Sequence, residues 1–303
     1  MLFSPIPPML AAMRPEPWTD PAWVFQPKFD GFRLQLHIDG DRMEAYTRSG
    51  RRITSQFPEL LTVRPNITAD TAILDGEIVC IREGRPRFDD LAARGHLTHP
   101  LKIQAAQTTH PATFVAFDVL HLNGHDLMAR PLVDRLAHLE AIIQPGPALM
   151  PSLTIPERGI ALFETTKDWG WEGIVAKRAS SLYEPGRRSP NWQKLKHWMR
   201  MEVVILGYRR HPHFALIVGA HFPTQRNKPV AAIERGYTNA DKTAFLAVAP
   251  QLHTTREKDI QWVAPSLCCE VQYLERTTRH QLRIATFKRF LPGKDPATCL
   301  WSA

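Results

Sequence analysis

The stretch that decides the fold reads Phe25-Gln-Pro-Lys28-Phe-Asp30-Gly31-Phe-Arg33-Leu. Lys28 is followed at fixed spacing by Asp30-Gly31 and Arg33, just as an alternating strand begins. Such a lysine can attack a nucleotide phosphate once its amine is uncharged, but a free lysine titrates near pH ~10.4. Burial and nearby cations must then lower the pKa of Lys28 by about 3, and Arg33 is a candidate source of that positive field. A surface hairpin of mixed charge explains these residues equally well.

The composition favours a two-domain protein with an anionic partner. The chain has 303 residues, a formal net charge of +8 and a pI near 9.5. This length suggests two domains, and the positive charge favours a polyanion over an acidic protein. The sequence contains no run of about 18 apolar residues and no signal peptide, so we expect a cytoplasmic protein that does not enter a membrane.

The cysteines do not predict a metal site. None of the four forms a Cys-x-x-Cys pair, and adjacent Cys268 and Cys269 point to opposite faces if they lie in a strand. Zinc binding and a disulfide framework are therefore not expected.

The first two-thirds of the chain predicts a mixed domain of antiparallel sheets and helices. Residues 1–27 are rich in proline, and we expect an irregular lead-in along the surface. Turn signals at Asp39-Gly40 and Asn123-Gly124 indicate hairpins. Alternating apolar residues predict strands, and a 3.6-residue period predicts two helices. The expected strands are 31–38, 43–47, 72–81, 114–122, 173–177 and 193–196, and the expected helices are 132–143 and 157–166.

The pattern changes after His197, where a second and smaller domain is expected. Five short strands with one helix after the third fit an OB-type barrel better than a sandwich. The strands are predicted at 203–209, 214–220, 230–236, 268–275 and 283–287, and the helix at 240–249. We therefore expect domains at residues 1–197 and 198–303, joined by a hinge at 196–200.

Two carboxylates in the first domain are candidates for a metal site. Glu77 follows Asp75-Gly76 in a predicted strand, and Glu172 immediately precedes another. Hard oxygen ligands suit Mg²⁺, so each is a candidate ligand for that ion or a contact to a ribose. Taken singly, Asp75-Gly76 also fits a turn and Glu172 a helix cap.

Two lysines and an aromatic residue extend the same chemistry. Lys194 and Lys196 alternate along a strand and share a face, so they can neutralise a triphosphate and help to lower the pKa of Lys28. Phe117 is a candidate to stack on a purine, although an aromatic at such a position is more often part of the core. Their joint occurrence with Lys28 argues against a purely structural explanation.

In this order the motifs resemble those of the covalent nucleotidyltransferase superfamily, and most closely the small stand-alone ATP-dependent DNA ligases of bacteria. Lys28-x-Asp30-Gly31-x-Arg33 resembles the nucleophile motif. The later motifs are matched by Arg48-Ser49-Gly50, Asp75-Gly76-Glu77, Phe117-Asp118, Glu172-Gly173-x-Val175-x-Lys177 and Lys194-x-Lys196. The resemblance implies an α+β fold: a nucleotidyltransferase domain of ATP-grasp-like antiparallel sheets with helices, followed by a small all-β OB-fold domain.

The resemblance also implies an activity and a set of site residues. Lys28 would form lysyl-AMP from ATP with Mg²⁺ or Mn²⁺, the AMP would move to a DNA 5′-phosphate, and the adjacent 3′-hydroxyl would displace it. Lys194 and Lys196 would assist in catalysis, Glu77 and Glu172 would hold the metal, and Arg48 would contact DNA or pyrophosphate. The implied nucleotide contacts are Gln26, Asp30, Arg33, Arg48, Glu77, Phe117, Glu172, Lys177, Lys194 and Lys196.

The same resemblance implies the biological setting. The expected partners are nicked double-stranded DNA and repair proteins such as the end-binding protein Ku. The protein is expected to act as a monomer near the nucleoid, in DNA repair and also in recombination and replication.

One motif near the C-terminus departs from the family. The family has an Arg-x-Asp-Lys/Arg element there that orients the leaving pyrophosphate, but this chain has Leu291-Pro-Gly293-Lys294. Lys294 is retained, and Arg289 is the candidate to compensate for the missing arginine. We therefore expect slow self-adenylylation, or a protein that is isolated already adenylylated.

Two alternative functions stay open at this point. An RNA ligase or a GTP-using capping enzyme shares the motifs, because discrimination between RNA and DNA depends on contacts to the 2′-hydroxyl. A non-catalytic OB-fold nucleic-acid binder is the second alternative. The joint retention of Lys28, Glu77, Glu172, Lys194 and Lys196 argues against it.

Overall fold

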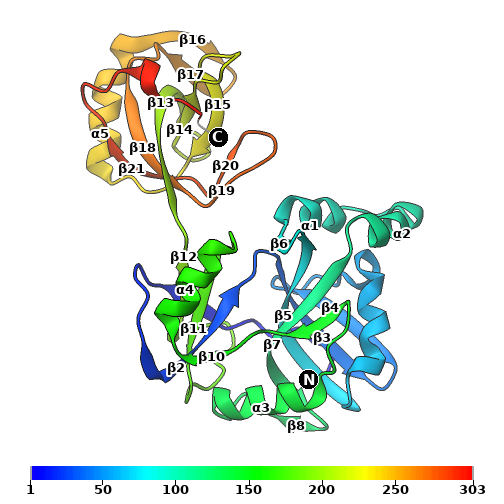
Figure 1. Ribbon diagram of the computed structural model, residues 1–303. Coiled ribbons are helices and arrows are strands. Elements are labelled where there is room, and N and C mark those ends of the chain that lie inside the picture. Colours follow the sequence, from blue (N-terminus) through cyan, green and yellow to red (C-terminus); the bar gives the residue numbers. More distant parts are fainter. Residues whose placement is uncertain (1, 302–303) are drawn as a thin grey trace. The chain divides into compact units, whose positions relative to one another are not determined.

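The computed structural model describes residues 2–301. Its contacts divide the chain into two compact units, Met1–His197 and Trp198–Ala303 (Figure 1). Each unit has its own β-sheet framework and its own hydrophobic core. The boundary lies between β12, which ends at Lys196, and β13, which begins at Met199. The predicted hinge at 196–200 therefore consists mostly of strand residues, and only His197 and Trp198 lie between the strands.

The first sheet of the N-terminal unit has the strand order β1-β12-β11-β2-β10. Strand alternation directs Phe25, Ile174 and Leu195 to one face, where Leu162 of helix α4 packs against them. The opposite face carries polar side chains and is free to line a pocket. The bounds are β1 Leu10–Met13, β2 Asp20–Lys28, β10 Ile155–Glu157, β11 Gly173–Arg178, β12 Arg188–Lys196 and α4 Gly159–Asp168.

The second sheet of this unit has the order β4-β3-β5-β7-β8, with β6 paired to β5 and β9 to β7. One face packs on the main core, to which helix α3 contributes Leu132, Leu136 and Leu139. The strands are β3 Phe32–Asp39, β4 Arg42–Thr47, β5 Thr71–Arg82, β6 Arg85–Pro86, β7 Ala112–Leu122, β8 His125–Asp126 and β9 Leu149–Pro151. The helices are η1 Thr54–Gln56, η2 Pro58–Asn66, α1 Phe88–Gly95, α2 Pro100–Thr109 and α3 Leu132–Ile142.

The prediction of an irregular lead-in over residues 1–27 is wrong, because this segment supplies β1 and most of β2. Pro27 is tolerated within β2 for a geometric reason. The neighbouring strand β10 pairs only with the part of β2 between Asp20 and Phe25, so Pro27 lies beyond its end and breaks no ladder on that side.

Helices α1 and α2 were not predicted, and their burial shows why. Only Ile103 and Ala106 of α2 are buried, which leaves no apolar stripe for a sequence pattern to reveal. Helix α1 is instead anchored by Arg94, a fully buried arginine that pairs with Glu59. Long-range charge pairing of this kind has no local sequence signal.

The C-terminal unit contains a sheet with the order β15-β14-β13-β17-β16, in which β18 pairs with both β13 and β21, and a separate pair of strands, β19 and β20. Helix α5 begins with a capping box formed by Thr238 and Asp241. The bounds are β13 Met199–Arg209, β14 Ala215–Ala220, β15 Lys228–Ile233, α5 Asn239–Val248, η3 Ala249–Leu252, β16 His253–Glu257, β17 Ile260–Val263, β18 Cys268–Tyr273, β19 Glu275–Arg276, β20 Leu282–Arg283, β21 Thr286–Phe290 and η4 Pro296–Thr298.

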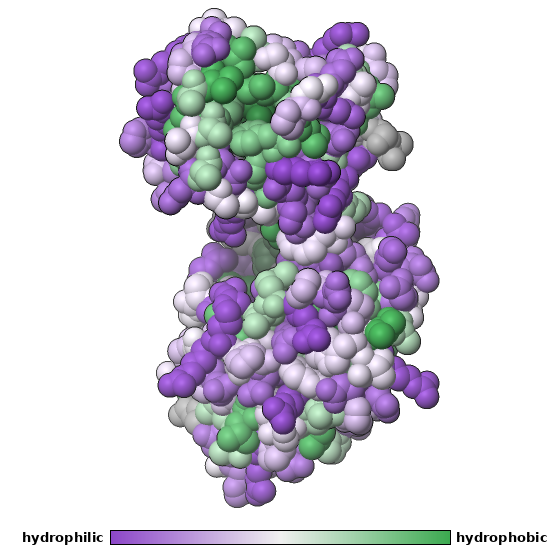
Figure 2. Space-filling model, turned by 90° about the vertical axis from the view of Figure 1, so that its left-hand side faces the viewer, coloured by the Kyte–Doolittle hydropathy of each residue, from purple (hydrophilic) through white to green (hydrophobic). Residues whose placement is uncertain are grey.

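The helix and the first four predicted strands of this unit are confirmed, whereas the predicted strand at 283–287 is divided between β20 and β21. Strand β16 was missed because all of its residues are exposed, so it has no apolar alternation. Cys268 and Cys269 lie on opposite faces as predicted, in different hydrophobic clusters. Hydrophilic side chains are spread over both units in the view of Figure 2, and hydrophobic ones gather on part of the C-terminal unit.

Candidate active site

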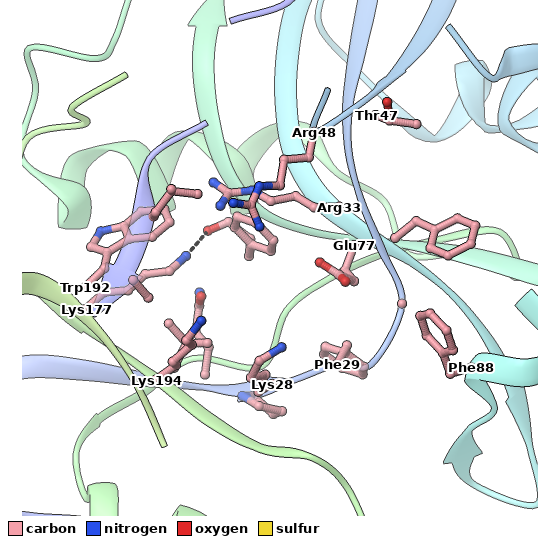
Figure 3. A pocket seen from close by; sticks show the side chains of 18 of the residues that line it. Lys28, Phe29, Arg33, Thr47, Arg48, Glu77, Phe88, Lys177, Trp192 and Lys194 are labelled. Atoms are coloured by element: carbon pink, nitrogen blue, oxygen red, sulfur yellow. Dashed lines mark hydrogen bonds between the residues drawn. The ribbon is translucent and has the colours of Figure 1, made fainter. Parts of the chain in front are cut away.

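A pocket of about 760 Å³ lies in the N-terminal unit, lined by residues from both of its sheets (Figure 3). Strands β2, β11 and β12 supply its lysines, and β3 and β5 supply Arg33 and Glu77. The predicted site residues that line it are Gln26, Lys28, Arg33, Arg48, Glu77, Phe117, Lys177 and Lys194. The structure therefore brings together residues that are far apart in the sequence, such as Lys28 and Lys194.

Strand register places Lys28, Gly173 and Lys196 side by side on β2, β11 and β12. The glycine is required here: its φ is +144°, and a Cβ at this position would lie 2.0 Å from the backbone oxygen of Leu195. The preceding residue, Glu172, forms ion pairs with both lysines. Its Oε2 lies 2.7 Å from Lys28 Nζ, and its Oε1 lies 2.6 Å from Lys196 Nζ.

The protonation state of Lys28 differs from the prediction. Burial disfavours its ammonium form, but the carboxylates of Glu172, Glu77 and Asp30 outweigh burial and raise the pKa of Lys28 above its usual value. The expectation that Arg33 and the lysines on β12 lower this pKa is therefore wrong for the ligand-free protein. The carboxylates lie nearer to Lys28 than the sequence spacing indicated.

Lys194 has the environment that was expected for Lys28. Burial lowers its pKa, and the neighbouring cations Lys196, Lys28 and Arg188 lower it further. Glu172 shows the opposite effect: burial opposes its charge, but Lys28 and Lys196 hold its pKa below the usual range. The site therefore concentrates positive charge at the position where a triphosphate is expected.

Arg33 is held in place by a buried carboxylate, that of Asp75. Its Nε and Nη2 donate to the two oxygens of Asp75 at 3.0 and 2.6 Å, and its Nη1 donates to the backbone oxygen of Met9 at 2.6 Å. Asp75 is completely buried and also accepts a hydrogen bond from the hydroxyl of Tyr183 at 2.7 Å. Sequence reasoning missed Tyr183 and Met9, because nothing in their local sequence indicates a polar network.

Glu77 lies opposite Arg33 in the β3–β5 ladder and faces the pocket. Burial raises the pKa of Glu77 to about 7, even though Lys28 and Arg33 act in the opposite direction. Near neutral pH this carboxyl is therefore divided between its neutral and charged forms, and a bound cation would favour the charged form.

Lys177 is enclosed by two aromatic rings. Its Nζ lies 4.2 Å from the ring centroid of Phe117 and 4.1 Å from that of Trp192, and it donates to the backbone oxygen of Phe117 at 3.1 Å (Figure 3). Burial lowers the pKa of Lys177 to about 7. The amine of Lys177 already contacts the ring of Phe117. A purine that stacks on Phe117, as predicted, would therefore contact a ring that Lys177 also contacts. Trp192 was not predicted, although it precedes Lys194 by two residues and so shares its face.

The other predicted residues occupy less direct positions. Gln26 is buried and donates to the hydroxyl of Thr154 at 2.9 Å. Arg48 is exposed on the pocket lining, where Arg51 and Arg188 join it without having been predicted. Asp118, part of a predicted motif, forms a fully buried ion pair with Arg135 at 2.7 Å and has a structural role.

Arg289 and Lys294 lie in the C-terminal unit and form ion pairs there. Arg289 pairs with Glu270 at 3.0 Å, and Lys294 pairs with Glu202 at 2.6 Å. Leu291, at the position where the resemblance implies an arginine, packs beside Cys268 and Cys299 in a small hydrophobic cluster. Its side chain therefore makes a core contact.

Most of the N-terminal unit matches a known protein family. The model of the ATP dependent DNA ligase domain matches residues 8–196. The chain belongs to the ATP-dependent DNA ligase family. The LigD protein of Mycobacterium tuberculosis H37Rv, a multifunctional non-homologous end joining DNA repair protein, is 30% identical over 293 residues, which cover 91% of this chain. A probable DNA ligase of Streptomyces avermitilis is 31% identical over 295 residues, which cover 91% of this chain and 57% of that protein.

A solved structure supports the two-domain ligase fold. The mycobacterial DNA ligase D complexed with ATP and MES is 29% identical, with a TM-score of 0.58 over 97% of this chain and 98% of that one. The predicted α+β class, a nucleotidyltransferase domain followed by an OB-like domain, is confirmed. The chain spans 37% of the length of the LigD proteins that it matches. None of the helices described within residues 2–301 is long and apolar enough to cross a membrane.

The carboxylates of this pocket are compatible with Mg²⁺ that is bound together with a nucleotide. Within residues 2–301, no group of three or more His, Cys, Asp or Glu side chains is arranged to hold a metal ion. Glu77 lines the pocket, whereas both oxygens of Glu172 are engaged by lysines. Mg²⁺ is commonly bound by one or two carboxylates together with substrate phosphates and water. The site therefore fits an ion that enters with a nucleotide, with Glu77 as the more available protein ligand.

Proposed function

We propose that this protein seals nicks between a 3′-hydroxyl and a 5′-phosphate in double-stranded DNA, using ATP and a lysyl-AMP intermediate on Lys28. The observation that carries the proposal is the pocket position of Lys28, paired with Glu172 in a chain of the DNA ligase family. Lys28 Nζ would release its protons to solvent and form a bond to the α-phosphorus as the bond to pyrophosphate breaks. The AMP would then pass to the 5′-phosphate, and the 3′-hydroxyl would displace it.

Attack by Lys28 requires loss of a proton from its amine, and the ligand-free site opposes that loss. Glu172, Glu77 and Asp30 all favour the ammonium form. When bound, Mg²⁺ or Mn²⁺ supplies positive charge that neutralises the phosphates and offsets these carboxylates. Glu172 is then placed to hold Lys28 in line with the phosphorus, while Lys194 and Lys196 stabilise the negative charge that develops on the phosphate oxygens.

In this proposal the remaining predicted residues would contact the nucleotide or the DNA, or would hold Lys28 in place. Arg33 and Glu77 would contact the sugar or phosphates, Phe117 and Lys177 the base, and Gln26 and Asp30 would hold β2 and Lys28 in place. Arg48, exposed on the lining, would contact the nicked strand.

The OB-like domain would act as a clamp that turns about residues 197–198. During self-adenylylation it would bring Lys294 or Arg289 to the departing phosphates, and for sealing it would present a basic face to the duplex. Binding to nicked DNA should weaken steeply with added salt, because phosphate contacts release counterions. A chain lacking residues 201–303 should lose nick binding, and full-rate sealing by that chain would exclude the clamp.

The pathway proposed is end-joining DNA repair, because the LigD relatives carry that activity in their names. The partner would be a DNA end-binding protein such as Ku, and the ligase would act as a monomer in the cytoplasm, on the nucleoid. Joining of linear duplex ends should increase when such a protein is added. Equal joining with and without it would remove this part of the proposal.

The central experiment measures covalent label on the denatured protein, separated by gel electrophoresis, after incubation with α-labelled ATP or GTP. We expect label from ATP, followed by sealing of a nicked duplex, and no label on Lys28→Ala. Lys102→Ala is the matched control, because Lys102 is an exposed lysine of α2 that lies away from the pocket lining. Label from GTP alone would favour a capping enzyme, and full sealing with ATP by Lys28→Ala would remove the proposed nucleophile.

A further inference from the structure

The hydroxyl of Tyr183 joins three segments that are distant in the sequence. It donates to Asp75 Oδ2 at 2.7 Å and accepts from the backbone nitrogen of Met9 at 3.2 Å and from Arg33 Nη2 at 3.3 Å. The residue lies in the loop between β11 and β12, and 4% of its surface is exposed. One hydroxyl therefore connects the lead-in segment, β3 and β5.

The ring of Tyr183 is fixed independently of its hydroxyl. It packs edge-to-face against Trp192 at a centroid distance of 5.7 Å, and the guanidinium of Arg135 lies 5.9 Å from its centroid. Its backbone nitrogen donates to the backbone oxygen of Met128 at 2.9 Å. A phenylalanine at this position would keep the ring contacts and the backbone bond, so the contribution of the hydroxyl can be tested separately.

The hydroxyl restricts the arginine that faces the pocket. Arg33 could rotate about its side chain while keeping one bond to Asp75, but several contacts prevent this. Met9 accepts from Arg33 Nη1 at 2.6 Å and donates its own nitrogen to Tyr183, and Tyr183 occupies the remaining side of Asp75 Oδ2. Arg33 is thereby held in one orientation on the pocket lining. A buried carboxylate with three donors is also a strong anchor for a guanidinium.

We propose that Tyr183 is a positioning residue for the ligase reaction: its hydroxyl holds the Arg33–Asp75 pair in the orientation in which Arg33 meets the nucleotide. The inference rests on the proposed function, since it requires a nucleotide in this pocket. It differs from a general stabilising role for a buried tyrosine, because the effect of the hydroxyl on catalysis has to act through Arg33.

The test is a double-mutant cycle on the full chain, with self-adenylylation measured across ATP concentrations. The variants are Tyr183→Phe, Arg33→Lys and the pair. Tyr183→Phe should raise the ATP concentration for half-maximal labelling about tenfold, the scale of one hydrogen bond in a charged network, and change the saturating rate less than threefold. The double variant should be no worse than Arg33→Lys alone, because the hydroxyl has no effect without its arginine. 4-Aminophenylalanine at position 183, which keeps a donor toward Asp75, should restore most of the affinity.

Tyr273→Phe is the matched control. Tyr273 is a buried tyrosine of the C-terminal unit whose hydroxyl accepts from Arg276 Nε at 2.9 Å, and it should label like the wild type. Half-maximal labelling of Tyr183→Phe within twofold of the wild type would overturn the inference, as would additive effects in the cycle. If Tyr183→Phe does not fold, the 4-aminophenylalanine variant takes its place, and labelling as weak as that of Arg33→Lys would overturn the inference. A wild type that takes no label from ATP would instead overturn the proposed function.

Discussion

The two sheets that enclose the pocket each contribute an ion pair, and the pairs differ in what they allow. Lys28 and Glu172 join β2 to the residue before β11 at 2.7 Å, and Arg33 and Asp75 join β3 to β5 at 2.6 Å. Glu172 is shared between two lysines, and an amine is a nucleophile once it is uncharged. Asp75 binds an arginine, which keeps its charge at every relevant pH. Distances alone do not separate the pair that reacts from the pair that supports it; the chemistry of the cation does.

The largest effect is expected where the reacting cation is replaced by one that cannot react. Lys28→Arg keeps a positive charge beside Glu172 but removes the nucleophile, so self-adenylylation should fall by more than about a thousandfold. The free energy of unfolding should change by less than about 1 kcal/mol. Label transfer and urea unfolding measure the two effects. Substantial labelling of Lys28→Arg would show that another residue receives the AMP.

Removing the carboxylate charge should destabilise the Arg33–Asp75 pair more than the Lys28–Glu172 pair, although the second pair matters more for labelling. Asp75→Asn leaves Arg33 with a weakened partner in a fully buried setting and should cost about 3 kcal/mol of unfolding free energy. Glu172→Gln should cost less, because it removes the main carboxylate that opposes the effect of burial on Lys28, and a lysine can then lose its proton whereas Arg33 cannot. Chemical denaturation of both variants is the measurement. Equal losses would mean that the Lys28 pair is as structural as the Arg33 pair.

Glu77 lies between the two pairs, and its pKa gives a prediction with a defined sign. The folded state raises this pKa from 4.5 to about 7, so folding is penalised as pH rises through that interval and the carboxyl ionises. Glu77→Gln should therefore be more stable than the wild type by about 1–3 kcal/mol at pH 8, and equally stable near pH 4.5. Thermal unfolding at both pH values measures the difference. A constant difference would show that Glu77 titrates normally.

The exposed ion pair of Arg82 and Asp90 should give the smallest change in the free energy of unfolding, and it serves as the reference for the buried pairs. Arg82 lies 2.8 Å from Asp90, about as close as the pocket pairs, but half of its side chain is exposed. Arg82→Gln should change the free energy of unfolding by less than about 0.5 kcal/mol and leave labelling unchanged. A loss comparable to that of Asp75→Asn would mean that burial is not what distinguishes the pairs.

Much of the fold could be predicted from local patterns. The hairpin strands that follow Lys28 and the helix at 132–143 were predicted because alternation and a 3.6-residue period reflect which face is buried. The first strands, helices α1 and α2 and strand β16 were not found, because short, exposed or proline-containing segments carry no such pattern. Their places are determined by pairing with distant strands and by buried pairs such as Arg94 with Glu59.

Motif spacing is a local property of the chain, so the amino-acid sequence alone was enough to predict the family and a common site for Lys28, Glu77, Glu172, Lys194 and Phe117. The charge states of these residues came only from the folded arrangement. Burial lowers the pKa of Lys177, whereas at Lys28 the neighbouring carboxylates outweigh burial and raise the pKa. Electrostatic energy depends on distance and burial in three dimensions, and neither can be read from spacing along a chain.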